Sequence, residues 1–131
     1  MAITKKAGRQ SPITAKVSFT MGTGADVSAV AVYEAIEVPE GAIVTGGYIL
    51  ISDATTATVD LNIGDGGSST RYAATVDGAA TGLTALVPTG YQYTAKDTID
   101  IAITVAAAEA AGAGELVVTY IVDGRDVFSQ G

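Results

Sequence analysis

Alternation of apolar and polar residues, repeated in several short segments, is the feature that most constrains how this chain can fold. It is clearest between residues 13 and 21, where every second residue is apolar: Ile13, Ala15, Val17, Phe19 and Met21. The residues between them are threonine, lysine and serine. A period of two residues puts the two sets of side chains on opposite faces of a β-strand. This segment is therefore predicted to be a strand with one buried face and one exposed face.

The same pattern, interrupted by turn residues, predicts about eight strands. They are expected at residues 13–20, 28–38, 42–52, 57–63, 70–75, 99–105 and 115–122, with a weaker stretch near 83–87. The chain has 14 valines, 11 isoleucines and 17 threonines but only 5 leucines, and β-branched residues favour strands. Glycine and proline mark the turns, as in Pro39-Glu40-Gly41. We therefore predict an all-β, single-domain, two-sheet β-sandwich.

One alanine-rich segment, residues 106–111, does not follow this pattern. It has the highest intrinsic helix propensity in the chain. Its six residues, which are followed by Gly112 and Gly114, fall short of the roughly 12–15 that an isolated helix needs. We expect an inter-strand loop there, with no more than one helical turn.

Histidine and cysteine are both absent from the 131 residues. Histidine is the side chain most often used for proton transfer near neutral pH, and it is the commonest metal ligand. Cysteine supplies disulfides, thiolate metal ligands and thiol nucleophiles. We therefore expect no enzymatic activity, no catalytic residue, no metal site and no cofactor.

A glycine-rich loop at residues 64–69 invites comparison with phosphate-binding and calcium-binding loops. It lacks the Gly-Lys-Ser/Thr ending of a phosphate-binding loop, and no helical pattern follows it. Asp60, Asn62 and Asp65 have the spacing of calcium ligands, but the required order of ligand and glycine is inverted at Asp65. Arg71 also stands where the bidentate glutamate is needed. A strand that runs into a turn is the preferred interpretation.

Two other sets of side chains suggest sugar chemistry. Glu34, Glu37 and Glu40 supply the pair of carboxylates that glycoside hydrolysis needs, but residues 34 and 37 of one regular strand face opposite sides. A solvated strand edge is therefore preferred. Aromatic faces for stacking on sugars are offered by Tyr33, Tyr48, Tyr72, Tyr91, Tyr93 and Tyr120. Because the chain has no tryptophan and two phenylalanines, we expect these tyrosines to fill the core and subunit interfaces.

Charge is distributed unevenly along the chain. The net charge is −7, yet residues 1–16 contain four basic residues and no acid. The remainder therefore holds 3 of the 7 basic residues and all 14 acidic ones, a net charge of −11. An acidic body repels phosphate backbones, so we expect no nucleic-acid partner.

The basic N-terminal segment is the predicted partner-binding part of the molecule. Residues 1–12 show no sustained periodicity, and we predict that they form an extended arm that precedes a sandwich domain at residues 13–131. Exposed ion pairs contribute roughly 0–1 kcal/mol each, so the cations should steer a partner, whereas buried isoleucines and backbone pairing hold it. The predicted partner-binding residues are Ile3, Lys5, Lys6, Arg9 and Ile13.

Composition also bears on location and assembly. No apolar run reaches the roughly 18 residues of a membrane span, and no hydrophobic signal core follows the first basic residues, so a soluble protein made in a cytoplasm is expected. Only 16% of the residues are charged, against 48% that are hydrophobic. That is more apolar surface than a monomer of this size hides comfortably. We therefore expect a homo-oligomer, most simply a trimer, which also covers exposed edge strands.

Four segments carry a resemblance to a known family. They are Pro39-Glu40-Gly41-Ala42-Ile43-Val44, Asp60-Leu61-Asn62-Ile63-Gly64-Asp65-Gly66 with Arg71-Tyr72 after it, Tyr93-Thr94-Ala95-Lys96-Asp97-Thr98-Ile99-Asp100-Ile101, and Gly114-Glu115-Leu116-Val117-Val118-Thr119-Tyr120. Over residues 28–123 the chain resembles the small jelly-roll decoration, or cement, proteins on the heads of tailed bacteriophages. The resemblance implies a jelly-roll-like sandwich with no catalytic residues.

The resemblance also implies a function. Such proteins assemble on the virion, commonly as trimers that grip neighbouring major capsid subunits. A non-enzymatic decoration subunit on the outer surface of a phage capsid is therefore expected, with the major capsid protein as its partner and host cytoplasm as its place of assembly. The alternative is a carbohydrate-binding or host-attachment module of a virion, which would use exposed tyrosines and the loop at residues 64–69.

Overall fold

The computed structural model describes residues 11–22, 25–26, 29–56, 58–105 and 111–122, and within these ranges it contains eight β-strands and no helix. The all-β prediction and the number of strands are therefore confirmed. The strands are β1 (Ile13–Gly22), β2 (Val32–Val38), β3 (Ala42–Asp53), β4 (Asp60–Gly64), β5 (Ala73–Asp77), β6 (Gly82–Ala85), β7 (Asp97–Val105) and β8 (Ala111–Val122).

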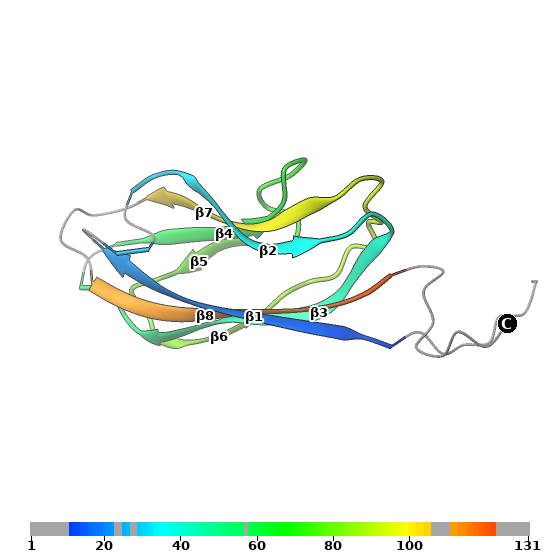
Figure 1. Ribbon diagram of the computed structural model, residues 1–131. Helices are drawn as coiled ribbons and strands as arrows, with labels where there is room; N and C mark the ends of the chain where they lie inside the picture. Colours follow the sequence, from blue (N-terminus) through cyan, green and yellow to red (C-terminus); the bar gives the residue numbers. More distant parts are fainter. Residues whose placement is uncertain (1–10, 23–24, 27–28, 57, 106–110, 123–131) are drawn as a thin grey trace, which may run out of the picture.

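The strands form two antiparallel sheets that lie face to face (Figure 1). Sheet A has the order β1-β8-β3-β6, and sheet B has the order β2-β7-β4-β5. The hydrogen-bonded pairs include β1 with β8, β2 with β7, β3 with β6 and β4 with β5. These four nested pairs alternate between the two sheets, which is the topology of a jelly roll. The predicted two-sheet sandwich is thus confirmed, with jelly-roll connectivity.

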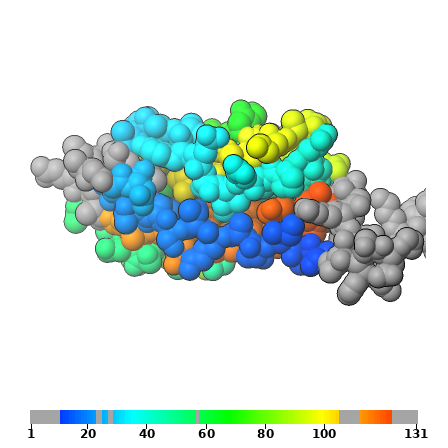
Figure 2. Space-filling model, viewed as in Figure 1, coloured from blue at the N-terminus to red at the C-terminus, as the bar shows by residue number. Residues whose placement is uncertain are grey.

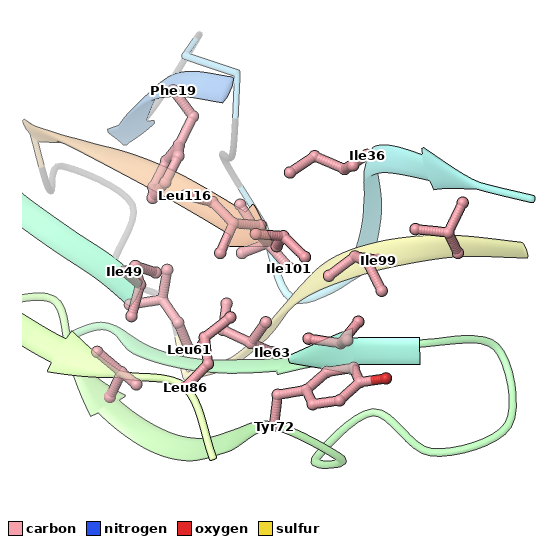
Figure 3. Close-up of a cluster of buried hydrophobic side chains, with 14 of the residues drawn as sticks. Phe19, Ile36, Ile49, Leu61, Ile63, Tyr72, Leu86, Ile99, Ile101 and Leu116 are labelled. Carbon is pink, nitrogen blue, oxygen red and sulfur yellow. The ribbon is translucent and has the colours of Figure 1, made fainter. Parts of the chain in front are cut away.

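The core lies between the sheets and is built from the inward side of each alternating strand (Figure 3). In β7 the inward residues are Ile99, Ile101 and Ile103, and in β8 they include Leu116 and Val118. All five are at most 3% exposed. Aliphatic β-branched side chains fill most of this layer, which explains how a chain with 5 leucines builds a core.

Several strands begin later than the alternation predicts, and local hydrogen bonds explain two of the differences. The strand expected from residue 28 begins at Val32. Before it, the hydroxyl of Tyr33 bonds the backbone of Ala29, and the backbone of Ala31 accepts from Ile103, so the chain bends there. The strand expected at 70–75 begins at Ala73, because Arg71 belongs to the preceding loop.

The remaining boundaries differ by a few residues. The strand expected at 57–63 begins at Asp60, and the strand expected at 83–87 ends at Ala85. The first and last of the eight strands in sequence, β1 and β8, are both longer than predicted. The loop expected at residues 106–111 lies outside the described residues, except that Ala111 already begins β8.

Two successive glycines in β3 provide a test of the pairing between β3 and β8. Gly47 has a φ of +133°, and a Cβ built on it meets the backbone oxygen of Val117 at 2.1 Å. Gly46, its neighbour, has nothing within 4 Å of the same position. Gly47→Ala is therefore expected to lower the free energy of unfolding by at least about 2 kcal/mol, because backbone must shift in the centre of sheet A.

Gly46→Ala is the matched control, and we expect it to change stability by less than about 1 kcal/mol. Urea denaturation of the two variants measures both values. Equal losses in the two variants would contradict the close approach of β3 and β8 at Gly47.

The two sheets leave two lateral sides, one bounded by β1 and β2 and the other by β6 and β5. In Figure 2 the near side of the molecule is formed by β1 (blue) and β2 (cyan).

In the described part of the chain, no helix is long and apolar enough to cross a membrane.

Candidate functional site

The predicted partner-binding residues fall almost entirely outside the described part of the chain. Ile3, Lys5, Lys6 and Arg9 belong to residues 1–10, which are not described. Ile13 is the first residue of β1, opposite Tyr120 of β8, and it packs partly buried against the core of its own chain. The structure therefore gives Ile13 a role in the fold, and the other four predicted residues lie outside the described part of the chain.

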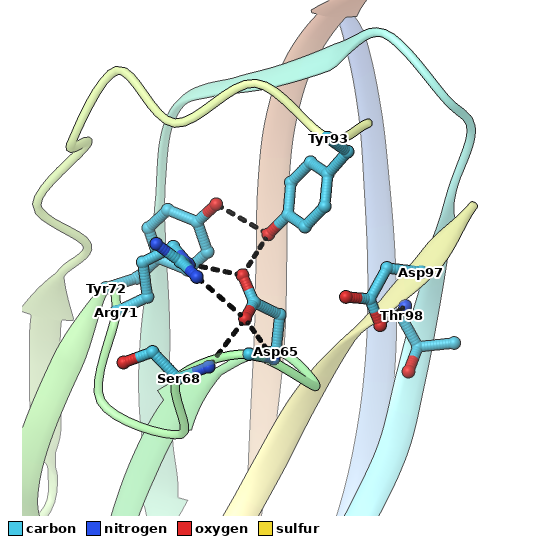
Figure 4. A network of polar contacts seen from close by, with 8 residues as sticks. Asp65, Ser68, Arg71, Tyr72, Tyr93, Asp97 and Thr98 are labelled. Atoms are coloured by element: carbon cyan, nitrogen blue, oxygen red, sulfur yellow. Dashed lines mark hydrogen bonds and ion pairs between the residues drawn. The ribbon is translucent and has the colours of Figure 1, made fainter. Parts of the chain in front are cut away.

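The most organised polar feature is a buried group of four side chains, Asp65, Arg71, Tyr72 and Tyr93, which we call the Asp65 cluster (Figure 4). Asp65 directly follows β4, Arg71 and Tyr72 lie just before β5, and Tyr93 lies in the connection from β6 to β7. The side chain of Asp65 is 1% exposed and pairs with the Nε of Arg71 at 2.5 Å. The cluster thus joins two connections, the one from β4 to β5 and the one from β6 to β7, at one end of sheet B.

Both carboxylate oxygens of Asp65 accept hydrogen bonds. Its Oδ1 accepts from the backbone N–H groups of Gly67 and Ser68, both at 2.9 Å. Its Oδ2 accepts from the hydroxyl of Tyr93 at 2.7 Å. The Tyr93 proton is committed to Asp65, so in the 2.6 Å contact between the two hydroxyls it is Tyr72 that donates.

These contacts control the protonation of the cluster. Burial by itself would raise the pKa of Asp65, but the hydrogen bonds from Arg71, Tyr93 and the loop backbone outweigh it and hold the pKa below its ordinary value of 3.8. Burial, together with the hydrogen bonds to Tyr72 and Asp65, raises the pKa of Tyr93, so its hydroxyl stays protonated. The cluster is therefore a carboxylate neutralised by a guanidinium and two neutral phenols.

Side chains of the glycine-rich loop and of the end of β4 are bonded to the protein itself. Both carboxylate oxygens of Asp65 are occupied by donors of the protein itself, and the side-chain oxygen of Asn62 accepts from the backbone of Thr75. Arg71 is also stacked on Tyr91, with 3.7 Å between the guanidinium carbon and the ring centroid. Asp65 and Asn62 are thus parts of the fold rather than calcium ligands.

The contacts of Asp65 with Arg71 and Tyr93 could not be predicted from the sequence. The partners of Asp65 lie 6 and 28 residues away along the chain. The one available signal was an isolated acid and an isolated arginine flanking a glycine-rich turn. The contact with Tyr93 depends on how the β6–β7 connection crosses the sandwich, which no local pattern encodes.

Glu34 and Glu37 do not face opposite sides of β2, and the expectation from regular alternation is wrong. The register of β2 against β7 shifts between Glu34 and Ile36, so Ala35 is an extra, bulged residue. The bulge puts Glu34 and Glu37 on the same exposed side, where they line a shallow hollow with Thr98. Their convergence is a consequence of the bulge.

Asp100 on β7 completes an acidic group on this outer face of sheet B. It is buried, lies opposite Glu34 in the register, and accepts from the hydroxyl of Thr98 at 2.6 Å. Burial raises the pKa of Asp100, and the nearby charges of Asp97 and Glu34 raise it further. Among the described residues, no three acidic side chains are arranged so that they could hold a metal ion.

The tyrosines do not form an exposed platform. Tyr72, Tyr93 and Tyr120 are buried in the core, which agrees with the interpretation preferred from the sequence. Tyr33 and Tyr48 are half-buried, and Tyr91 is 38% exposed but packs edge-on against Tyr93. A sugar-binding surface built from exposed tyrosines is therefore not supported.

Acid is expected to change the stability of the protein in two opposite steps. The folded-state pKa of Asp100 lies above its ordinary value of 3.8, so stability rises as the pH falls from neutral through the raised pKa towards 3.8. The folded-state pKa of Asp65 lies below 3.8, so its contribution is complete above 3.8 and is lost as the pH falls through the lowered pKa. The free energy of unfolding should therefore pass through a maximum at mildly acidic pH.

Urea denaturation at a series of pH values checks this prediction with two variants. Asp100→Asn should remove the rise on the neutral side, and Asp65→Asn should flatten the fall on the acidic side. A stability that falls steadily from neutral pH in the native chain and in Asp100→Asn alike would contradict the assignment.

Comparison with known proteins gives matches at the level of structure. No protein-family model matches the sequence, and no curated protein matches it. A chain of a structure described as the capsid asymmetric unit of cyanophage Pam1 is 24% identical, with a TM-score of 0.70 over 93% of this chain and 92% of that chain. These values show a shared fold.

Two further solved structures share the fold. One is described as an acidic stable capsid structure of Helicobacter pylori bacteriophage KHP30, with 20% identity and a TM-score of 0.67 over 87% of this chain and 90% of that chain. The other is the capsid of Ralstonia phage GP4, with 13% identity and a TM-score of 0.53 over 95% of this chain and 91% of that chain. The fold is thus similar, over most of the length of both chains, to a chain in each of three phage capsid structures.

Proposed function

We propose that this protein is a non-enzymatic structural subunit of a bacteriophage virion, a decoration or cement protein that binds the outside of the capsid and stabilises it. The observation that carries the proposal is the similarity in fold over nearly the whole length of chains from three phage capsid structures. Because the alignment covers about nine tenths of both chains in each case, the matched chains are close to this one in length.

The site chemistry supports a role in assembly. Among the described residues no buried side-chain nitrogen or oxygen lacks a hydrogen-bond partner, and the carboxylate of Asp65 is bonded by Arg71, Tyr93 and the loop backbone, so the Asp65 cluster holds the fold together. Exposed apolar side chains, in contrast, lie on both lateral sides of the sandwich, at Val32 and at Leu83. Surfaces of this kind are covered when a protein assembles with partners. The proposed partners are the major capsid protein and further copies of this chain, most simply as a trimer.

The experiment that tests the proposal is co-sedimentation of the purified protein with capsids of its parent phage, followed by cryo-electron microscopy of the pellet. We expect saturable binding and additional density on the outer capsid surface, with greater resistance of decorated capsids to heat. Density confined to the neck or tail, or no binding to intact capsids, would overturn the proposal. A glycan array serves as the control for the host-attachment alternative and should give no binding.

A further inference from the structure

The four edge strands of the sandwich differ in how they are protected against pairing with other chains. Natural edge strands carry charges, bulges or distortions that discourage such pairing. β1 carries Lys16 at its middle, and β2 carries Glu34, Glu37 and the bulge at Ala35. β5 is distorted at Thr75, which has a φ of +54°, and it ends in Asp77. Three of the four edge strands therefore carry features that discourage pairing with another chain.

β6 is the exception. All four of its residues are exposed, its register with β3 has no shift, and it contains no charge and no proline. It lies within an uncharged run of 18 residues, from 78 to 95, in a chain that has 21 charged residues. Leu83 is 59% exposed and Val87 is 66% exposed. Apart from its short length and the φ of +150° at its first residue, Gly82, β6 carries none of the features that protect the other three edge strands.

The apolar surface continues from β6 onto the outer face of sheet A. Leu83 lies opposite Leu50, and Ala85 lies opposite Tyr48, on the side of β3 that faces away from the core. Tyr48 and Leu50 are half-buried. We call the surface formed by Tyr48, Leu50, Leu83, Ala85 and Val87 the β6 patch. The outer face of sheet B, in contrast, carries the acidic group around Asp100.

We infer that the β6 patch is the surface through which copies of this chain contact one another. Copies of an acidic protein repel each other wherever acids meet, and an uncharged surface is where they approach without that cost. The patch lies along one lateral side of the sandwich, so the patches of several copies can meet around a symmetry axis, where their apolar side chains cover one another. This inference rests on the oligomer proposed above, but not on the capsid as its target.

Two lysine substitutions at equally exposed positions test the inference. Leu83→Lys places a charge in the β6 patch, and Val32→Lys places one on β2, at the opposite lateral side. Both side chains are 59% exposed, so neither substitution should disturb the core. We expect Leu83→Lys to raise the concentration needed for half-assembly at least about tenfold, as judged by light scattering, and Val32→Lys to leave it unchanged. Circular dichroism checks that both variants fold.

A cysteine reporter gives an independent measurement, because the chain has no cysteine of its own. Under mild oxidation Ala85→Cys should form disulfide-linked pairs of chains, and Thr104→Cys, at an exposed position of β7, should not. A native protein that stays at its monomer mass of 13.1 kDa at micromolar concentration would overturn the inference. So would an unchanged mass in Leu83→Lys, or equal cross-linking of both cysteine variants.

Capsid co-sedimentation separates this inference from the proposed function. If Leu83→Lys keeps the native mass in solution but no longer binds capsids, the β6 patch faces the capsid and the inference is wrong while the proposed function stands. If the native protein assembles through the patch but binds no capsid, the inference stands and the proposed function fails.

Discussion

Replacing Asp65 with asparagine is expected to lower the free energy of unfolding by at least about 3 kcal/mol. Asparagine has nearly the same shape, but its amide group carries no charge and presents N–H donors to a site that already contains the donors of Arg71 and Tyr93. At least one buried donor then loses its acceptor. Urea denaturation at neutral pH measures the loss.

Asp97→Asn is the control for this prediction. Asp97 is near the same loop, but it is half-buried and its Oδ1 accepts from the backbone N–H of the next residue, Thr98. We expect Asp97→Asn to cost less than about 1 kcal/mol. Combining Asp65→Asn with Arg71→Met should give a loss smaller than the sum of the two single losses, because the two residues form one pair. Losses that simply add would mean that the Asp65 cluster is not a unit.

Deleting residues 2–12 is expected to leave the fold and oligomer intact while weakening capsid binding by about 10²–10⁴-fold. The pairing of β1 with β8 begins at Ile13, and Ser11 and Pro12 are exposed and outside the strand, so the described core loses nothing. The size of the effect follows from multivalency: tethered arms act at high effective concentration in an oligomer. This prediction rests on the proposed capsid function and on the predicted role of the arm.

A variant whose arm carries no charged side chain separates the contribution of charge to the rate of binding from the contribution of the rest of the arm to affinity. Changing Lys5, Lys6 and Arg9 to alanine should reduce the rate of binding and its dependence on salt, with a smaller loss of final affinity than the deletion. Capsid binding of the three proteins across a salt titration measures both effects. If the truncated protein decorates capsids as tightly as the full chain, residues 1–12 are not a binding arm.

Sequence periodicity was sufficient to predict the strands but not the bulges within them. The alternation from Ile13 to Met21 predicts β1 because one face of a strand must be apolar to reach the core. The same logic fails at Glu34 and Glu37, because one bulged residue, Ala35, reverses the alternation after it. A bulge depends on the partner strand, so the sequence of β2 alone does not encode it.

The candidate interaction surfaces show the same division between local and long-range information. The position of Leu83 on an edge strand depends on the order of the strands in sheet A, and strand order is a property of the whole fold. The Asp65 cluster likewise needs Tyr93 from a distant connection. Charge distribution, in contrast, is local: the basic residues at 1–16 and the uncharged run at 78–95 can both be recognised directly in the sequence.

The nested strand order has a consequence for how the protein is made. β8, the last of the described strands to be synthesised, lies between β1 and β3 in sheet A and pairs with both. Until it emerges, β1, the first strand made, has no neighbour in its sheet and β3 is paired on one side only. Closing the β1–β8 pair also joins segments separated by almost the entire chain, which makes folding slow. A nascent chain therefore exposes unpaired apolar strands until β8 has been synthesised, and its escape from aggregation depends on β8 pairing with β1 and β3 before another chain does.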